Sequence, residues 1–326
     1  MKYRQLGKTN LSVSEISLGC SGFWGNSNFP EKKASAVVFE AFERGVNFFD
    51  TGHNYCNFHA EPRLGRIVRE LLLNRDRSSL VISSKAGATV GAARVMPVPR
   101  ARQKNFSPKF VEKVCAKSIR NLNCDYLDIF QLHGPTITEI TEPLLKRLSI
   151  MREQGMFRYL GVNTHSKEVM LYVAKHPEIF DMVLIDFNIL QLDREPIIDE
   201  LDQSGIGVVA GTVLGQGHLV KGKIGSLKTS ADIWYLGRAL LKRSGRVLAK
   251  RSREMREALN LISEMSASQA AFSFILENPK VASCVFGTTK IANLIEIIES
   301  GDKRLGRKSQ TMIRNTFKLL QEESGM

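Results

Sequence analysis

The chain has 326 residues, of which 43% are hydrophobic and 24% charged, with a formal net charge of +13. This length and composition allow a large buried core and are not typical of disorder. No apolar run approaches the roughly 18–20 residues needed to cross a bilayer, so a membrane-bound protein is not expected.

Two further features concern where the protein works. The amino terminus has no apolar signal core. The five cysteines are odd in number and scattered, and they show no CxxC spacing. Neither a disulfide framework nor a metal site is therefore predicted, and we expect a cytoplasmic protein.

The positive charge is concentrated in residues 242–256 and 303–314. It has two interpretations: a nucleic-acid or membrane patch, or solvated helix faces whose field attracts an anionic small molecule. Aromatic residues, which a single-strand binder needs, are missing from both runs. We therefore prefer the second interpretation and expect neither nucleic acid nor membrane as a partner.

In chain order, short apolar runs typical of strands alternate with amphipathic stretches typical of helices. Ser107 and Pro108 form an N-cap pattern, and Gly45 and Gly155 stand where helices should end. The expected helices include 35–44, 62–73, 108–122 and 142–154. The expected strands are 15–18, 46–49, 80–84, 127–132, 159–162, 182–187, 207–210 and 282–286.

Eight strands alternating with helices predict a parallel (β/α)8 barrel, the TIM barrel, as one domain over residues 1–326. A doubly wound open sheet is the competing fold, and it needs a glycine-rich phosphate turn after its first strand. The segment from Gly19 to Gly25, GCSGFWG, does not have that pattern. The longest irregular stretches are 89–105 and 212–233.

Ionisable side chains stand at the ends of three successive predicted strands. Asp50 follows the second strand with Tyr55 in the next loop, Lys85 ends the third strand, and His133 ends the fourth. In a barrel these ends converge on one mouth, where active sites form. Singly, Asp50 could cap a loop and His133 could be a structural histidine, whereas together they suggest a catalytic site.

The four residue types suit proton donation to a carbonyl. A phenol is a poor acid near neutral pH, but a neighbouring lysine favours the phenolate, and an aspartate fixes that lysine. A histidine opposite can donate a hydrogen bond to the carbonyl oxygen. Reduction of a carbonyl by hydride transfer requires this combination.

The spacing Asp50-x4-Tyr55, then Lys85, then His133, resembles the catalytic tetrad of the aldo-keto reductase superfamily. Similar motifs cover nearly the whole chain: YRQLGKT to SEISLG at its start, GVNFFDT, DYLD, RYLGV, QAA and the late FG. The resemblance implies a (β/α)8 barrel with an N-terminal β-hairpin and a C-terminal helix. It also implies a nicotinamide cofactor, usually NADPH, with Tyr55 as general acid.

The same resemblance indicates the cofactor-binding positions, with departures that include two in the nicotinamide pocket. Leu184 stands where the family has a glutamine for the carboxamide, and Gly211 where it has an aromatic residue that stacks on the nicotinamide; Asn188 is a possible substitute. The arginine and asparagine of the adenosine end are replaced by Asn293 and Ile297. The expected cofactor-binding residues are Gly19, Asn163, Thr164, Asn188, Gly211, Leu214, Gln216, Gly217, Gly287, Thr288 and Lys290.

The preferred function is therefore an NADPH-dependent oxidoreductase that reduces an aldehyde or ketone to an alcohol, or the reverse. The alternative is a non-redox barrel, either a lyase or dehydratase or a regulatory subunit, with a weakened nicotinamide site. A small carbonyl or alcohol, possibly anionic, is the expected substrate. The sequence indicates neither its identity nor the oligomeric state.

Overall fold

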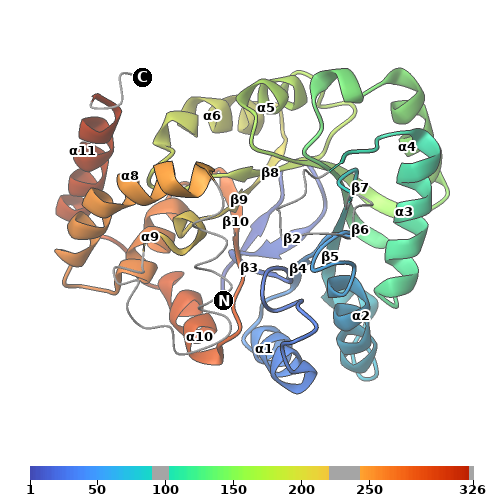
Figure 1. Cartoon of the computed structure of the whole chain (residues 1–326), viewed down its shortest axis with the longest axis horizontal. Helices are drawn as coiled ribbons and strands as arrows, with labels where there is room; N and C mark the ends of the chain where they lie inside the picture. Colours follow the sequence, from blue (N-terminus) through green and yellow to red (C-terminus); the bar gives the residue numbers. More distant parts are fainter. Residues whose placement is uncertain (90–102, 220–242, 323–326) are drawn as a thin grey trace.

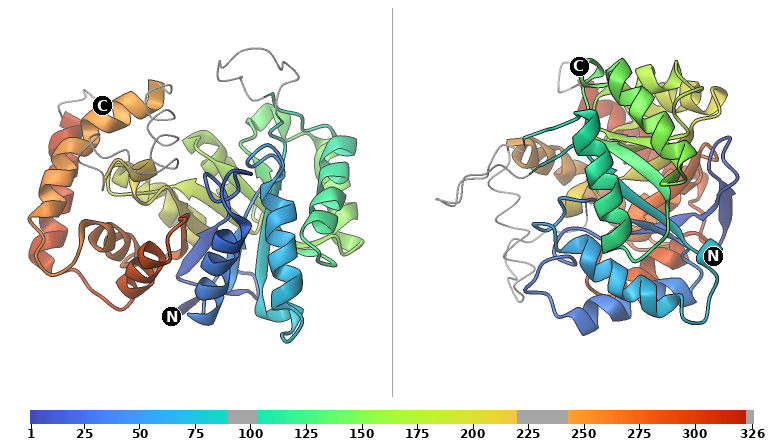
Figure 2. Two further views of the ribbon diagram at one scale, coloured as in Figure 1. Left: turned by 60° about the horizontal axis from the view of Figure 1, so that its bottom comes forward. Right: turned by 90° about the vertical axis from the view of Figure 1, so that its right-hand side faces the viewer.

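The computed structural model describes residues 1–89, 103–219 and 243–322. Eight parallel strands close into a barrel, in the order β10-β3-β4-β5-β6-β7-β8-β9. Helices surround the strands, with α8–α11 on one side and α2–α4 on the opposite side (Figure 1). The left view of Figure 2 shows these two groups of helices on opposite sides of the barrel. The predicted TIM barrel is confirmed.

All eight predicted barrel strands are present, with ends shifted by at most a few residues. They are β3 (Ile16–Gly19), β4 (Phe48–Asp50), β5 (Val81–Ala86), β6 (Leu127–His133), β7 (Phe157–Thr164), β8 (Met182–Asp186), β9 (Gly207–Gly211) and β10 (Val281–Phe286). A separate antiparallel hairpin, β1 (Tyr3–Gln5) and β2 (Ser12–Ser14), opens the chain.

The four predicted helices are α1 (Glu31–Glu43), α2 (Ala60–Leu71), α3 (Pro108–Asn121) and α4 (Glu142–Glu153). Gly45 and Gly155 follow α1 and α4 in the left-handed region, at φ +87° and +75°, as expected of residues that terminate helices. The other helices are α5 (Lys167–Ala174), α6 (Glu195–Gln203), α8 (Arg243–Asn260), α9 (Ala267–Leu276), α10 (Ile291–Ser300) and α11 (Arg307–Glu322).

Alternation along the strands separates two cores. Outward side chains such as Phe49, Ile82 and Phe130 pack against the helices. Inward side chains form a second cluster inside the barrel, which the hairpin closes from below with residues from its turn and from β2. The inner cluster comprises Leu6, Leu11, Val13, Phe48, Val81, Ile129, Met182, Leu184, Val209 and Ala282.

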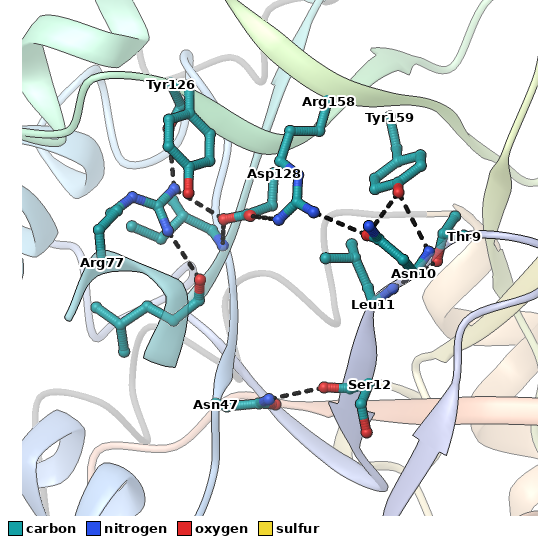
Figure 3. Close-up of polar contacts among 12 residues, drawn as sticks. Thr9, Asn10, Leu11, Ser12, Asn47, Arg77, Tyr126, Asp128, Arg158 and Tyr159 are labelled. Carbon is teal, nitrogen blue, oxygen red and sulfur yellow. Dashed lines mark hydrogen bonds and ion pairs between the residues drawn. The ribbon is translucent and has the colours of Figure 1, made fainter.

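A polar network ties the hairpin to the amino-terminal ends of the strands (Figure 3). The carboxylate of Asp128, which is 1% exposed, accepts hydrogen bonds from Arg77 (2.7 Å), Arg158 (3.2 Å) and the backbone N–H of Ile82 (2.9 Å). Arg158 also donates to the Asn10 side chain at 2.7 Å. This network holds the closed end of the barrel and leaves the opposite end for chemistry.

Candidate active site

Inward-facing residues at the carboxyl ends of the strands form the rim of the barrel mouth. Asp50 is the last residue of β4, and Lys85 lies one residue before the end of β5. Side chains along a strand alternate between its two faces, and Phe48 and Val81 belong to the inner cluster. Asp50 and Lys85 lie an even number of positions after them on the same strands, so they also point into the barrel. Residues 35 positions apart in the chain thus come into contact because β4 and β5 pair side by side in the barrel.

Lys85 and Asp50 form a buried ion pair. The ammonium nitrogen lies 2.5 Å from Oδ2 of Asp50 and donates to the carbonyl oxygen of Thr51 at 2.6 Å. The side chain of Lys85 is 0% exposed and that of Asp50 is 6% exposed. Gln131, which is fully buried, donates from Nε2 to Oδ1 of Asp50 at 3.1 Å and to Ser83 at 2.6 Å. The carboxylate is therefore fixed from both oxygens.

Burial by itself acts to lower the pKa of Lys85, because a low-dielectric surrounding disfavours the ammonium. The charge of Asp50, the contact with Tyr55 and the hydrogen bonds to both residues outweigh burial, and the pKa of Lys85 lies above its ordinary value. Lys85 is consequently a permanent cation at neutral pH.

Tyr55 lies over this cation and beside His133. The Lys85 nitrogen is 5.1 Å from the centroid of the Tyr55 ring. The Tyr55 and His133 rings meet edge to face, with centroids 5.5 Å apart and an interplanar angle of 85°. The ring of Tyr55 also packs on Gly52, where a Cβ would approach ring atoms to 3.2 Å. The structure thus brings together all four residues predicted as catalytic.

The turn after Tyr55 is strained. Cys56, Asn57 and Phe58 all have positive φ, at 53°, 54° and 69°, a conformation that costs roughly 1–2 kcal/mol per residue for side chains other than glycine. The thiol of Cys56 donates to the carbonyl oxygen of Gly22 and so fastens this turn to the loop after β3. This conformation makes the chain turn sharply directly after Tyr55.

Three neighbouring strands of the rim, β9, β10 and β3, end at or next to glycine. Gly211 and Gly19 are the last residues of β9 and β3, and Gly287 follows β10. A Cβ on Gly19 would meet Val285 at 2.9 Å, and one on Gly287 would meet the Gly19 carbonyl oxygen at 3.1 Å. At this arc of the rim the three glycines place no side chain of their own between the backbone and a ligand, which suits the close approach of a large flat ligand.

The other predicted cofactor-binding residues continue that arc. Gln216 and Gly217 belong to the 3-10 turn after β9 (Gly215–Gly217), and Leu214 is its N-cap. Gly217 has φ +93°, and among the described residues no atom lies within 4 Å of the position that a Cβ would take. The hydroxyl of Thr288 accepts from the N–H of Lys290, which stands at the start of α10. A lysine beside a helix amino terminus suits a phosphate.

The remaining positions are divided between the mouth and the loops. Asn163 and Thr164 end β7 and are buried, and the Asn163 amide donates to the Leu184 carbonyl oxygen at 3.3 Å. The Asn188 amide already donates to the Gln191 side chain (2.7 Å) and, in the next loop, to the Thr212 carbonyl oxygen (3.2 Å). Asn188 therefore makes a poor substitute for the missing glutamine.

Leu184 fills the space that Gly211 leaves. Its side chain belongs to the inner cluster, and its Cδ2 would lie 3.0 Å from a Cβ on Gly211. The two departures seen in the sequence are thus neighbours in space and pack against each other.

Two groups at the mouth escaped prediction as site residues. Gln131 precedes His133 by two positions, so strand alternation places both inside the barrel, and that spacing was the available signal. Asp186 ends β8, and its Oδ2 lies 2.6 Å from Nδ1 of His165. An aspartate that orients His165 cannot be paired with it from sequence alone.

Glu61 is a buried carboxylate in the first turn of α2, behind the sheet. It accepts from Ser84 at 2.6 Å and from Asn121 at 3.0 Å. It therefore ties α2 and α3 to the outer face of β5, and it does not reach the mouth directly.

A barrel with a buried lysine–aspartate pair under a tyrosine, and a histidine beside that tyrosine, defines an oxidoreductase of the aldo-keto type. A protein-family model described as "Aldo/keto reductase family" matches residues 15–316. The chain belongs to this family.

Relatives of similar length agree with this assignment. The chain is 26% identical to the uncharacterized oxidoreductase YqkF of Bacillus subtilis (93% of this chain, 92% of the relative). It is 25% identical to L-glyceraldehyde 3-phosphate reductase of Escherichia coli K12 (92% and 87%). It is also 26% identical to a probable voltage-gated potassium channel subunit beta of Arabidopsis thaliana (93% and 92%).

A solved structure shows the same fold. The holo form of aldo-keto reductase AKR11C1 from Bacillus halodurans superposes with a TM-score of 0.75 at 21% identity, covering 97% of this chain and 96% of that one. Within the described residues, no helix is long and apolar enough to span a membrane.

Proposed function

We propose that this protein is an NADPH-dependent reductase of small aldehydes or ketones, acting in either direction. The observation that carries the proposal is the buried Lys85–Asp50 pair directly beneath Tyr55. Burying an ammonium and a carboxylate costs free energy because both lose their hydration. The position of this pair under the Tyr55 ring suggests a role in catalysis and not in stability.

In the proposed mechanism, Tyr55 protonates the carbonyl oxygen and Lys85 stabilises the phenolate that remains. Asp50 fixes the ammonium, and Gln131 fixes Asp50. His133 donates a hydrogen bond to the same oxygen and orients it. Bound NADPH would supply the hydride to the carbonyl carbon. In the oxidative direction the same groups act in reverse.

The cofactor would lie across the glycine arc, which consists of Gly211, Gly287 and Gly19. Asn163 and Thr164 would hold the carboxamide, the turn containing Leu214, Gln216 and Gly217 would cover the pyrophosphate, and Thr288 and Lys290 would meet the 2′-phosphate. The residues fit this ligand because three adjacent strand ends present no side chain there.

An anionic carbonyl compound is the preferred substrate class. The net charge of +13 favours the approach of anions, and the E. coli relative is named for a phosphorylated aldehyde. The cytoplasm remains the proposed compartment. All five cysteines are free, and burial raises the pKa of the Cys115 and Cys284 thiols, which keeps them unreactive.

The test is the loss of NADPH absorbance with a panel of small aldehydes and ketones, with and without phosphate or carboxylate groups. Tyr55→Phe should abolish turnover while NADPH binding, followed by fluorescence, stays within about twofold, because only the acidic hydroxyl is removed. Failure of every carbonyl at every pH would refute the reductase. NADPH binding without turnover would then favour the non-redox alternative suggested by the packed Leu184 and Gly211.

A further inference from the structure

The carboxylate of Asp186 lies on the side of the mouth opposite the catalytic pair. In the closed order of eight strands, β8 stands four strands from β4, and β9 stands four strands from β5. Asp186 therefore faces Asp50 across the barrel, and Gly211, its register partner on β9, faces Lys85. Asp186 lies on the same inward face of β8 as Met182 and Leu184, because side chains alternate along a strand.

One oxygen of this carboxylate is paired with His165, and the other lies near Gly211. Oδ2 lies 2.6 Å from Nδ1 of His165, whose side chain is 72% exposed. Oδ1 lies 3.9 Å from the position that a Cβ on Gly211 would occupy. The space beside Gly211 thus has a carboxylate oxygen at its edge.

The positive groups around Asp186 keep it ionised. Burial acts to raise the pKa of Asp186, but hydrogen bonds from His165 and Thr212 and the charges of His165 and Arg194 outweigh burial, and the pKa lies below its ordinary value. Arg194 is directed at main chain: it donates to the carbonyl oxygens of Asp186 and His165. Water screens the charge of the exposed His165, whereas the Asp186 carboxylate lies next to Gly211 in the β8–β9 register.

We propose that Asp186 biases the site toward the oxidised nicotinamide. This inference rests on the proposed function, which places the ring in the mouth between Tyr55 and the β8–β9 side. The ring carries a positive charge when oxidised and none when reduced. A fixed carboxylate at the edge of its site stabilises the cation selectively, without a stacking aromatic, and favours hydride donation by the bound cofactor.

The test compares the Kd of NADP⁺ and NADPH, measured by calorimetry, in the wild type and two variants that each lose one carboxylate. Asp186→Asn should reduce the preference for NADP⁺ about tenfold, equivalent to about 30 mV in the potential of the bound two-electron couple. Asp199→Asn removes the same charge from α6, where Asp199 pairs with Lys280. It should leave the ratio of the two Kd values unchanged.

The outcomes separate this inference from the proposed function. Equal changes in both Kd values in Asp186→Asn, or no change, would overturn the inference while leaving the reductase intact. Failure of the wild type to bind either form would refute the proposed function itself. Should Asp186→Asn not fold, His165→Gln keeps the carboxylate and removes its partner: an equal or stronger preference for NADP⁺ supports the inference, and a weaker one overturns it.

Discussion

Replacing Lys85 by methionine tests the buried pair, because it separates structural from chemical effects. The substitution keeps an unbranched side chain of similar length but removes the ammonium donor, while the hydrogen bond from Gln131 to the Asp50 carboxylate at 3.1 Å remains. Breaking one side of a buried ion pair costs about 3–5 kcal/mol. With an unfolding entropy of about 2.1 cal/mol/K per residue, 326 residues give a Tm decrease of about 4–8 °C.

A matched double variant, Lys85→Met with Asp50→Leu, removes both charges together. Since replacing a buried pair by apolar side chains is often neutral or stabilising, its Tm should return to within a few degrees of the wild type. Carbonyl reduction should stay about 10²–10⁴-fold below the wild type in both variants. Calorimetry and initial rates supply the two readouts. A double variant as unstable as the single one, or either variant with wild-type turnover, would refute the reasoning.

The pH dependence gives a second check on the same pair. The folded-state pKa of Lys85 lies above 10.5, its ordinary value. The stability that its ammonium contributes is therefore fully present below pH 10.5 and is lost as the pH rises through the folded-state pKa. The Tm difference between the wild type and Lys85→Met should be constant from pH 6 to 10 and shrink above that range. A difference that shrinks on acidification would contradict this assignment.

Three further predictions concern other parts of the chain. Asp128→Asn should lower the Tm by several degrees while NADPH binding is retained, because the charge that Arg77 and Arg158 share is remote from the mouth; lost binding at an unchanged Tm would contradict this. Leu184→Gln should tighten NADPH binding severalfold, measured by fluorescence, yet lower the Tm, since an amide then enters the apolar inner cluster; unchanged affinity would argue against a carboxamide at this position. Burial lowers the pKa of His53 below 6.5, so its protonation favours the unfolded state as the pH falls below that value; His53→Asn should flatten the decline of Tm between pH 7 and 5, and an unaltered decline would refute this.

Much of the fold could be predicted from local pattern. Apolar runs such as Leu127–His133 and glycines such as Gly155 follow from the side-chain chemistry of a few adjacent residues. Trp24, which follows β3, shows the limit of that approach. It is 2% exposed and donates to the Ala34 carbonyl oxygen within the outer core. Its partner lies on the following helix, and composition does not reveal that packing.

The sequence by itself determined the alternation of strands and helices and the residue types at the strand ends. Apolar side chains repeat every two residues in strands and every 3.6 residues in helices, and the residue that follows each strand is given by chain order. Only the tertiary structure decided which strand ends face one another. Closure of the barrel places Asp186 opposite Asp50, packs Leu184 into the space beside Gly211, and brings Gln131 under the catalytic pair. These contacts join residues tens of positions apart in the chain. The physical reason is that closure of the barrel sets the distances between such side chains and their burial, and both determine how strongly their charges interact.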